Sequence, residues 1–149
     1  MPNKNTIKNA ITIAIASVWL INGLFCKVLN MVPRHQAIVA QILGDDYAYL
    51  ATKLIGCAEI LMFVWILSRI KPRFCAISQI AIVGLMNIIE FFWVPNLLLF
   101  GHLNALFAAI FMLVVYLQQV HRILQVLSTF KTAYTITDNF HYTNQQPEV

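Results

Sequence analysis

The stretch GLMNIIEFFWVPN, residues 84–96, places one ionisable side chain, Glu90, among large apolar neighbours. With the apolar residues that precede it, this stretch makes a run of about 20 residues, the length that a helix needs to cross the hydrocarbon core of a bilayer. The run ends at Pro95, which cannot continue a helix. Because a carboxylate is costly against lipid, the stretch predicts a transmembrane helix that turns Glu90 toward other helices.

The composition of the whole chain agrees with a membrane environment. Of its 149 residues, 60% are hydrophobic and 11% are charged, whereas a soluble domain carries about 25% charged residues. A soluble chain of this length has too much surface to cover with so few charges. We therefore expect the lipid bilayer to be its solvent, and its length bounds it to one domain.

Four segments are long and apolar enough to span a membrane, and glycine or proline separates them at Gly44, Pro72 and Pro95. The predicted spans cover residues 10–29, 47–67, 74–94 and 97–117. The pattern predicts an all-α fold, an antiparallel four-helix transmembrane bundle that forms a single domain of residues 1–120. Residues 121–149 are predicted as a cytoplasmic polar tail, loosely ordered from Lys131 onward.

The basic residues predict the orientation of the bundle. With four spans, the N-terminus, the connection between the second and third spans, and the tail share one side, which carries seven of the ten lysines and arginines. The positive-inside rule then places both termini in the cytoplasm. No basic run is interleaved with aromatic residues, so we predict no nucleic-acid partner.

The connection between the first two spans predicts a short helix. Pro33 suits a helix start and Gly44 a helix stop. Between them, Ile38 and Val39 fall on one face, opposite Arg34. This pattern is typical of an amphipathic helix in the membrane interface. Such a helix is either a lid over the polar residues of the spans or a linker that rests on lipid.

Polar residues of the four spans gather at one depth. At about 1.5 Å of rise per residue, eight of them fall in the outer half or near the middle: Asn22, Lys27, Lys53, Glu59, Asn87, Glu90, His102 and Asn104. The inner halves hold no ionisable residue. We interpret the eight as candidate ligand-binding residues, with interhelical contacts and lysines that reach the headgroups as the structural alternatives.

Spacing within the spans indicates which of these side chains share a helix face. Asn87 and Glu90 are three residues apart, as are Gly56 and Glu59, and a glycine lets a neighbouring helix approach closely. Lys53 and Glu59 are six apart, roughly 120° around the helix. We therefore expect Glu59 to face another span, with Lys27 or Lys53 as its partner.

No catalytic motif is present, so the sequence leaves open whether the protein is an enzyme, and it assigns no cofactor. The three cysteines, Cys26, Cys57 and Cys75, form no CxxC pair and suggest no disulfide. Glu59, Glu90 and His102 remain a less favoured set of ligands for a metal.

Several short motifs resemble the DoxX-like family of small bacterial four-helix membrane proteins, and this resemblance implies the bacterial cytoplasmic membrane as the location. The motifs are WLINGLFCK at residues 19–27, the pair Gly56 and Glu59 in the second span, and Pro95 followed by His102. The resemblance covers about residues 15–120 and implies the same four-helix fold, with Lys27 and Glu59 at positions that match the family pattern. The family takes its name from a subunit of an archaeal membrane complex that oxidises sulfur compounds and passes electrons to quinone. Other members are linked to the handling of redox stress.

These observations lead to one preferred hypothesis, an accessory or binding subunit for a lipophilic, quinone-like ligand in a membrane redox system. Asn22, Asn87 and His102 would bind the polar head, Glu59 and Glu90 would exchange protons, and a redox partner protein would supply electrons. One alternative is a small proton-coupled transporter, although the inner halves offer no polar path. The other is a structural subunit of a membrane complex.

Overall fold

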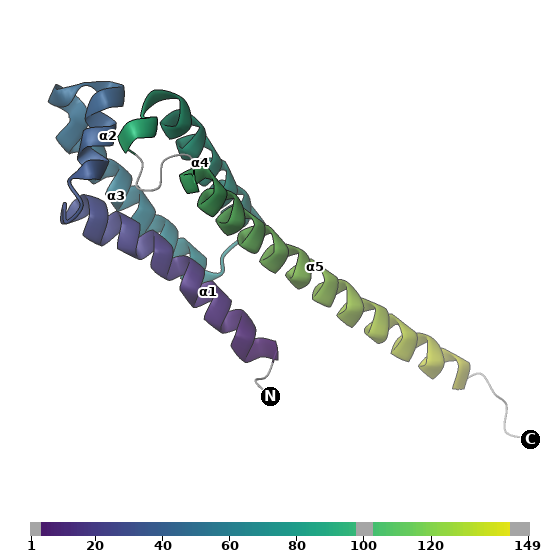
Figure 1. Ribbon diagram of the computed structural model, residues 1–149. Helices are drawn as coiled ribbons and strands as arrows, with labels where there is room; N and C mark the ends of the chain where they lie inside the picture. Colours follow the sequence, from purple (N-terminus) through teal and green to yellow (C-terminus); the bar gives the residue numbers. More distant parts are fainter. Residues whose placement is uncertain (1–3, 98–102, 144–149) are drawn as a thin grey trace, which may run out of the picture. The chain divides into compact units, whose positions relative to one another are not determined.

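The computed structural model describes residues 4–97 and 103–143. Every regular element in these ranges is helical, which confirms the predicted all-α fold (Figure 1). In chain order, the elements are α1 (Lys4–Leu20), η1 (Ile21–Val28), α2 (Arg34–Leu43), α3 (Asp45–Ser68), α4 (Pro72–Trp93), η2 (Pro95–Leu97) and α5 (Leu103–Thr143). The chain forms two compact units, residues 1–116 and 117–149, and α5 contributes to both.

Within the described part of the chain, four helical segments are long and apolar enough to cross a membrane, as predicted. They are Thr6–Val28, Asp45–Ser68, Pro72–Trp93 and Leu103–Lys131. The fourth differs from its predicted bounds, because Leu97 belongs to the 3₁₀ helix η2 and α5 begins at Leu103. Hydropathy alone does not separate a helix from an apolar turn. The apolar residues after Pro95 were therefore predicted as the start of the fourth span.

The ends of the helices follow from glycine, proline and residues in the left-handed region. Gly44, with a φ of 90°, ends α2 and lets α3 begin at the next residue. Its N–H donates to the carbonyl of Ala40 at 2.8 Å. Arg69 and Lys71, with φ of 57° and 45°, form the turn between α3 and α4. Pro72 then opens α4, where its missing N–H leaves no helical bond unmade.

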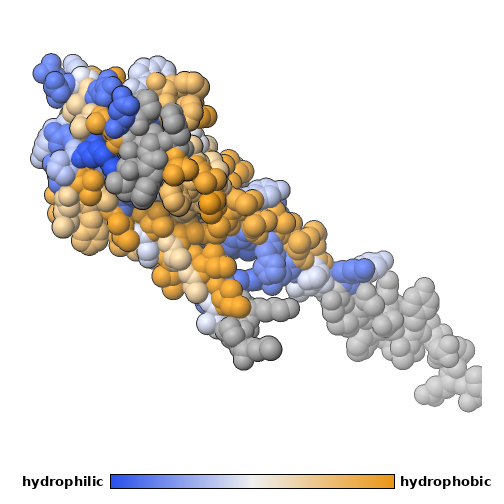
Figure 2. Space-filling view, in the orientation of Figure 1, coloured by the Kyte–Doolittle hydropathy of each residue, from blue (hydrophilic) through white to orange (hydrophobic). Residues whose placement is uncertain are grey.

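The long helices of the first unit run in alternating directions, which confirms the predicted antiparallel arrangement (Figure 1). α1 and η1 lie along α3, and α2 packs on α3 and η1. A cluster of buried side chains joins the helices: Ile15, Ala16, Trp19, Met62, Ile66, Cys75, Ala76 and Val115. Many large apolar side chains remain exposed (Figure 2), as lipid-facing helices require. The predicted short helix between the first two spans is α2.

The second unit differs from the loosely ordered tail predicted from Lys131. The helix α5 continues to Thr143. From residue 103 to residue 143 the sequence contains no glycine and no proline, so no residue in this range interrupts the helical hydrogen bonds. Polar composition alone therefore predicted the wrong backbone for residues 131–143.

Candidate ligand-binding site

The site begins at a close crossing between η1 and α3, where two glycines face each other. A Cβ atom on Gly23 would lie 2.7 Å from the carbonyl oxygen of Gly56 and 2.8 Å from Cβ of Glu59. A Cβ atom on Gly56 would lie 2.8 Å from the carbonyl oxygen of Gly23 and 2.9 Å from Cβ of Lys27. No real Cβ fits at these distances, so both positions require glycine for the two backbones to approach.

The same crossing brings together the two residues that match the family pattern. Lys27 lies one helical turn after Gly23, and Glu59 follows Gly56 by three residues. The Lys27 ammonium donates to both carboxylate oxygens of Glu59, at 2.7 Å and 2.8 Å. Their side chains are only 6% and 8% exposed. The sequence left Lys27 and Lys53 open as partners of Glu59, and the structure selects Lys27.

Lys53 lies on α3, apart from this ion pair. Its ammonium donates to the backbone carbonyl of Val28, the last residue of η1. It also lies over the ring of Tyr49, 5.3 Å from the ring centroid. A π-helix leaves backbone groups at its end without the usual helical partner, and Lys53 satisfies one of them.

The helices α4 and α5 add a second group of polar side chains. The amide nitrogen of Asn104 donates to Oδ1 of Asn87 at 3.3 Å and to Oε2 of Glu90 at 3.5 Å. The amide of Asn87 also donates to the carbonyl of Val83 at 2.9 Å. Within residues 4–97 and 103–143, no cation lies within ion-pair distance of Glu90. This carboxylate therefore keeps capacity for further hydrogen bonds.

These side chains converge on a cavity of about 330 Å³ inside the first unit. Six of the eight predicted site residues line it: Asn22, Lys27, Glu59, Asn87, Glu90 and Asn104. They come from η1, α3, α4 and α5, so four elements that are distant in sequence contribute to one chamber. Lys53 does not line this cavity, and His102 lies outside the described residues. Whether the six bind a ligand stays a prediction.

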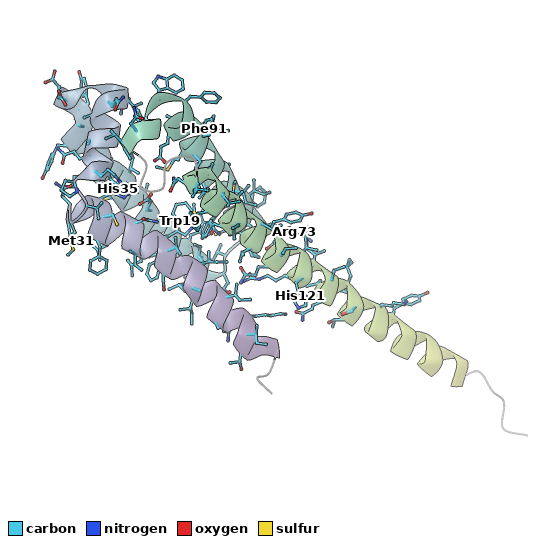
Figure 3. The ribbon with its side chains drawn as sticks, viewed as in Figure 1. Trp19, Met31, His35, Arg73, Phe91 and His121 are labelled. Carbon is cyan, nitrogen blue, oxygen red and sulfur yellow. The ribbon has the colours of Figure 1, made fainter. Side chains whose placement is uncertain are left out.

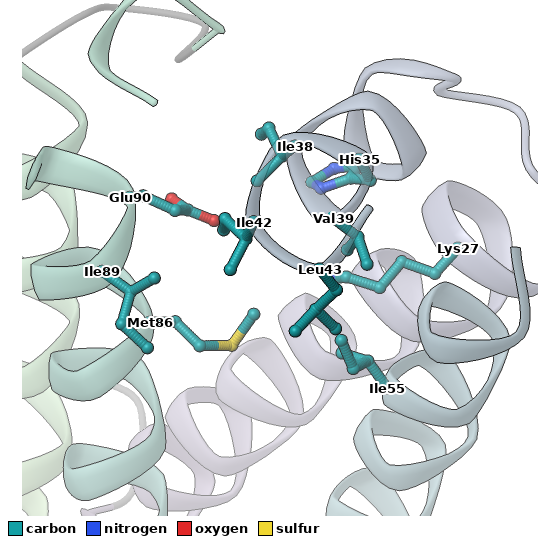
Figure 4. Close-up of a pocket in the computed structure, with 10 residues that line it drawn as sticks. All are labelled: Lys27, His35, Ile38, Val39, Ile42, Leu43, Ile55, Met86, Ile89 and Glu90. Carbon is teal, nitrogen blue, oxygen red and sulfur yellow. The ribbon is translucent and has the colours of Figure 1, made fainter. Parts of the chain in front are cut away.

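An apolar cavity of about 230 Å³ adjoins the polar one (Figure 4). The two share Lys27, His35, Met86 and Glu90 in their walls. The remaining wall is aliphatic and comes from α2, α3 and α4: Ile38, Val39, Ile42, Leu43, Ile55 and Ile89. A polar chamber and an apolar arm thus lie side by side and share part of their walls.

His35 is a wall residue that the sequence analysis did not identify. It lies on α2 in both cavities, near Trp19 and the end of the first span (Figure 3). Burial, together with the positive charges of Lys27 and Arg34, lowers the pKa of His35 to about 4. The imidazole is therefore neutral at neutral pH and offers one donor and one acceptor. Its position one helical turn before Ile38 and Val39 was the signal that could have placed it on the inner face of α2.

Trp19 closes the polar chamber toward the core of the bundle. Its indole N–H donates to Oε1 of Gln79 at 3.0 Å, and the amide of Gln79 contacts Sγ of Cys75 at 3.5 Å. Trp19 and Gln79 are each 5% exposed. Gln79 lies in the inner half of the third predicted span, and a buried amide can pair across any neighbouring helix, so its partner was not predictable from the sequence.

The cysteines and the possible metal ligands stay separate in the described residues. Cys26, Cys57 and Cys75 form no disulfide with one another. No group of three histidine, cysteine or carboxylate side chains within residues 4–97 and 103–143 has the geometry to hold a metal ion. The set of Glu59, Glu90 and His102 includes a residue outside these ranges.

Comparison with known proteins identifies the family. The family model described as DoxX-like family matches residues 16–117, which is most of the chain. The chain therefore belongs to the DoxX-like family and is an integral membrane protein, in agreement with its four candidate spans. No curated protein and no solved structure matches the chain significantly.

Proposed function

We propose that this DoxX-like protein binds a lipophilic small molecule with a polar head, of the quinone class, and acts as a binding or accessory subunit of a membrane redox system. The observation that carries the proposal is the pair of neighbouring cavities. A polar chamber lined by Asn22, Glu90 and Asn104 lies beside an aliphatic cavity, and the two share wall residues that include Lys27 and Glu90. Ligand sites combine apolar walls with a few convergent polar groups in this way.

The polar chamber suits a head with oxygen atoms that accept or donate hydrogen bonds. Asn22 and Asn104 carry amide N–H donors, neutral His35 carries a donor and an acceptor, and Glu90 accepts. Lys27 and Glu59 neutralise each other in the chamber wall. A neutral head therefore fits this chamber better than an anion, because Lys27, the cation among the described lining residues, is already paired with Glu59.

The apolar arm suits the tail of the same molecule. Its aliphatic walls from α2 and α4 offer contacts to a hydrocarbon or isoprenoid chain, and its volume is about 230 Å³. The arm adjoins the head chamber through Lys27, His35, Met86 and Glu90. In this arrangement α2 covers the tail, which is the lid role that the sequence left open against a linker on lipid.

In a redox system, Glu90 is the side chain best placed to exchange protons with the head. It lines both cavities, and Asn104 orients its carboxylate at 3.5 Å. The sequence contains no motif for an electron-carrying cofactor, so electrons would reach the ligand from a partner protein. From the family resemblance we propose the bacterial cytoplasmic membrane as the location, and from the distribution of basic residues we propose that both termini lie in the cytoplasm.

Quenching of Trp19 fluorescence tests the proposal directly, because Trp19 lines the polar chamber. In a Trp65→Phe, Trp93→Phe background reconstituted into nanodiscs, a short-chain ubiquinone should quench Trp19 saturably. Glu90→Gln keeps the shape but removes the charge, and should weaken binding by about 10-fold, since a hydrogen bond to a charged group contributes about 1.5–3 kcal/mol.

Asp46→Asn is the matched control, because Asp46 is an exposed carboxylate in the first turn of α3 and lines neither cavity. This variant should bind the quinone as the parent does. Quenching that rises linearly with quinone, equally in all three proteins, would reflect collisions within the bilayer and would contradict the proposal.

A second candidate function, a structural subunit of a membrane complex, is favoured by the crossing of η1 and α3. Gly23, Gly56 and the Lys27–Glu59 pair form a complete helix contact without any ligand. The two functions differ in their response to Glu90→Gln. A structural role predicts unchanged assembly and no quinone affinity to lose, whereas a binding role predicts the loss of affinity with thermal stability retained.

A further inference from the structure

The helix α5 carries a regular stripe of apolar side chains that does not belong to the ligand cavity. Its members alternate at spacings of three and four residues: Leu103, Leu106, Ile110, Leu113, Leu117, Val120, Leu124 and Leu127. This is the spacing of positions a and d in a coiled coil, sustained without interruption over four heptads. All members are exposed except Val120, which is half-buried.

Within the first unit, the stripe lies away from the bundle. The face of α5 that lines the polar chamber holds Asn104, Phe107, Ala108 and Phe111. At 3.6 residues per turn, the stripe from Leu103 to Leu113 is rotated by roughly 130° from the centre of that face. The helix therefore presents one set of side chains to its own chain and a separate set outward.

Lipid can cover the first part of this stripe but not its continuation. A bilayer core takes about 20 helical residues, so a helix that enters the core near Leu103 leaves it near residue 122. The sequence agrees, because polar residues become frequent at this level: Gln118, Gln119, His121, Arg122, Gln125, Ser128 and Thr129. Leu124 and Leu127, each 58% exposed, then face water in the single chain, which is unfavourable.

Leu124 and Leu127 could be covered by a membrane surface or by a second helix, and the charges along α5 distinguish between these two. A helix that lies on a membrane surface carries many lysines and arginines on its polar face, whereas Arg122 is the only charged residue from 118 to 130. A paired helix requires that its flanking positions e and g do not repel. From Phe107 to Phe130 these positions are all uncharged: Phe107, Ala109, Val114, Tyr116, His121, Ile123, Ser128 and Phe130.

We propose that α5 pairs with α5 of a second copy of this chain, in a parallel coiled coil along the stripe. Two copies inserted in one membrane with the same topology have parallel α5 helices, so equal residues meet across the pair. Lys131 follows at the next a position, where a polar residue fixes register and oligomeric state at some cost in stability.

Disulfide trapping in native membranes tests the pairing with the full chain. In a background with Cys26, Cys57 and Cys75 replaced by serine, Leu124→Cys or Leu127→Cys places one thiol in the stripe. Mild oxidation should link most of the protein into dimers of twice the 17.0 kDa chain mass. Thr129→Cys, at an exposed f position on the opposite side of α5, should give at least 10-fold less dimer.

A second measurement keeps the test decisive if a cysteine variant folds poorly. Light scattering of the purified parent protein in mild detergent should give a dimer, and Leu124→Lys should give a monomer with unchanged helix content. Thr129→Lys is the matched control and should remain a dimer. Equal linking at all three cysteine positions, linking to a different protein, or a monomeric parent would each overturn the proposal.

Discussion

The first unit holds its polar side chains in two different ways. Where η1 crosses α3, the two backbones lie so close that no Cβ fits at Gly23 or Gly56. At the same crossing, the buried ammonium of Lys27 binds both carboxylate oxygens of Glu59 at 2.7 Å and 2.8 Å. On α4, a Cβ atom on Gly84 would lie 3.6 Å from Sδ of Met112, an ordinary contact.

The polar contacts show the same difference. Between α4 and α5, Asn104 reaches Asn87 at 3.3 Å and Glu90 at 3.5 Å, near the limit of a hydrogen bond. The cavity lies between these two regions, with Glu59 on one wall and Glu90 on another. The comparison suggests a division of roles, in which the tight crossing supplies stability and the looser contacts leave space and hydrogen-bonding capacity for a ligand.

Loss of the ion pair is expected to have the largest effect. Glu59→Ala leaves Lys27 buried without its partner and should lower the free energy of unfolding by about 3–5 kcal/mol. The free energy of unfolding can be measured by titrating mixed micelles with a denaturing detergent. Asp46→Ala removes an exposed carboxylate from the same helix and should change stability by less than about 0.5 kcal/mol.

The double replacement Lys27→Met, Glu59→Met sharpens this experiment. It removes both charges and fills their space with apolar atoms, so most of the lost stability should return. If Glu59→Ala were as stable as Asp46→Ala, the ion pair would not be the stabilising element of the crossing.

The second prediction compares glycines across the two regions. Gly56→Ala forces a Cβ against the Gly23 carbonyl at 2.8 Å and should destabilise by about 1–3 kcal/mol. Gly84→Ala adds the same atom where there is room and should stabilise α4 by up to about 1 kcal/mol through helix propensity. The same detergent titration measures both. If both substitutions changed the free energy of unfolding equally, the packing around Gly56 would be no tighter than the packing around Gly84.

Much of the fold was predictable from the sequence, because hydropathy, length and the breakers Gly44 and Pro72 mark the spans directly. The depth argument also brought Asn22, Asn87 and Glu90 to one level, and the structure places them around one cavity. Depth follows from counting residues along a helix, so a single sequence contains that information.

Side-chain partners were less predictable, because they depend on how each helix is rotated. Lys27 and Lys53 lie at similar depths, and only the close approach at Gly23 decides that Lys27 meets Glu59 while Lys53 binds the Val28 carbonyl. His35 lies on α2, outside the four spans, so the depth of polar residues within the spans does not identify it. Polar composition does not distinguish a solvated helix from a disordered segment, so the helix beyond Lys131 was not predictable from composition.

The smallest expected effect concerns His35, which lies between the two regions on the wall of both cavities. The pKa of His35 in the folded protein is about 4, below the usual histidine value of 6.5, because of burial and the charges of Lys27 and Arg34. The unfolded chain therefore binds more protons between these values, and stability falls as the pH is lowered from 6.5 toward 4. Above pH 6.5 the contribution is complete, since both states hold a neutral imidazole.

His35→Gln keeps a neutral hydrogen-bonding side chain and removes the titration. The melting temperature of this variant should depend less on pH between about pH 5 and 6.5 than that of the parent, and the two should differ little in slope above that range. Limiting the comparison to this window keeps most carboxylates ionised in both proteins. Parallel curves for parent and variant would mean that His35 is open to water, and α2 would then not cover the cavity as a lid.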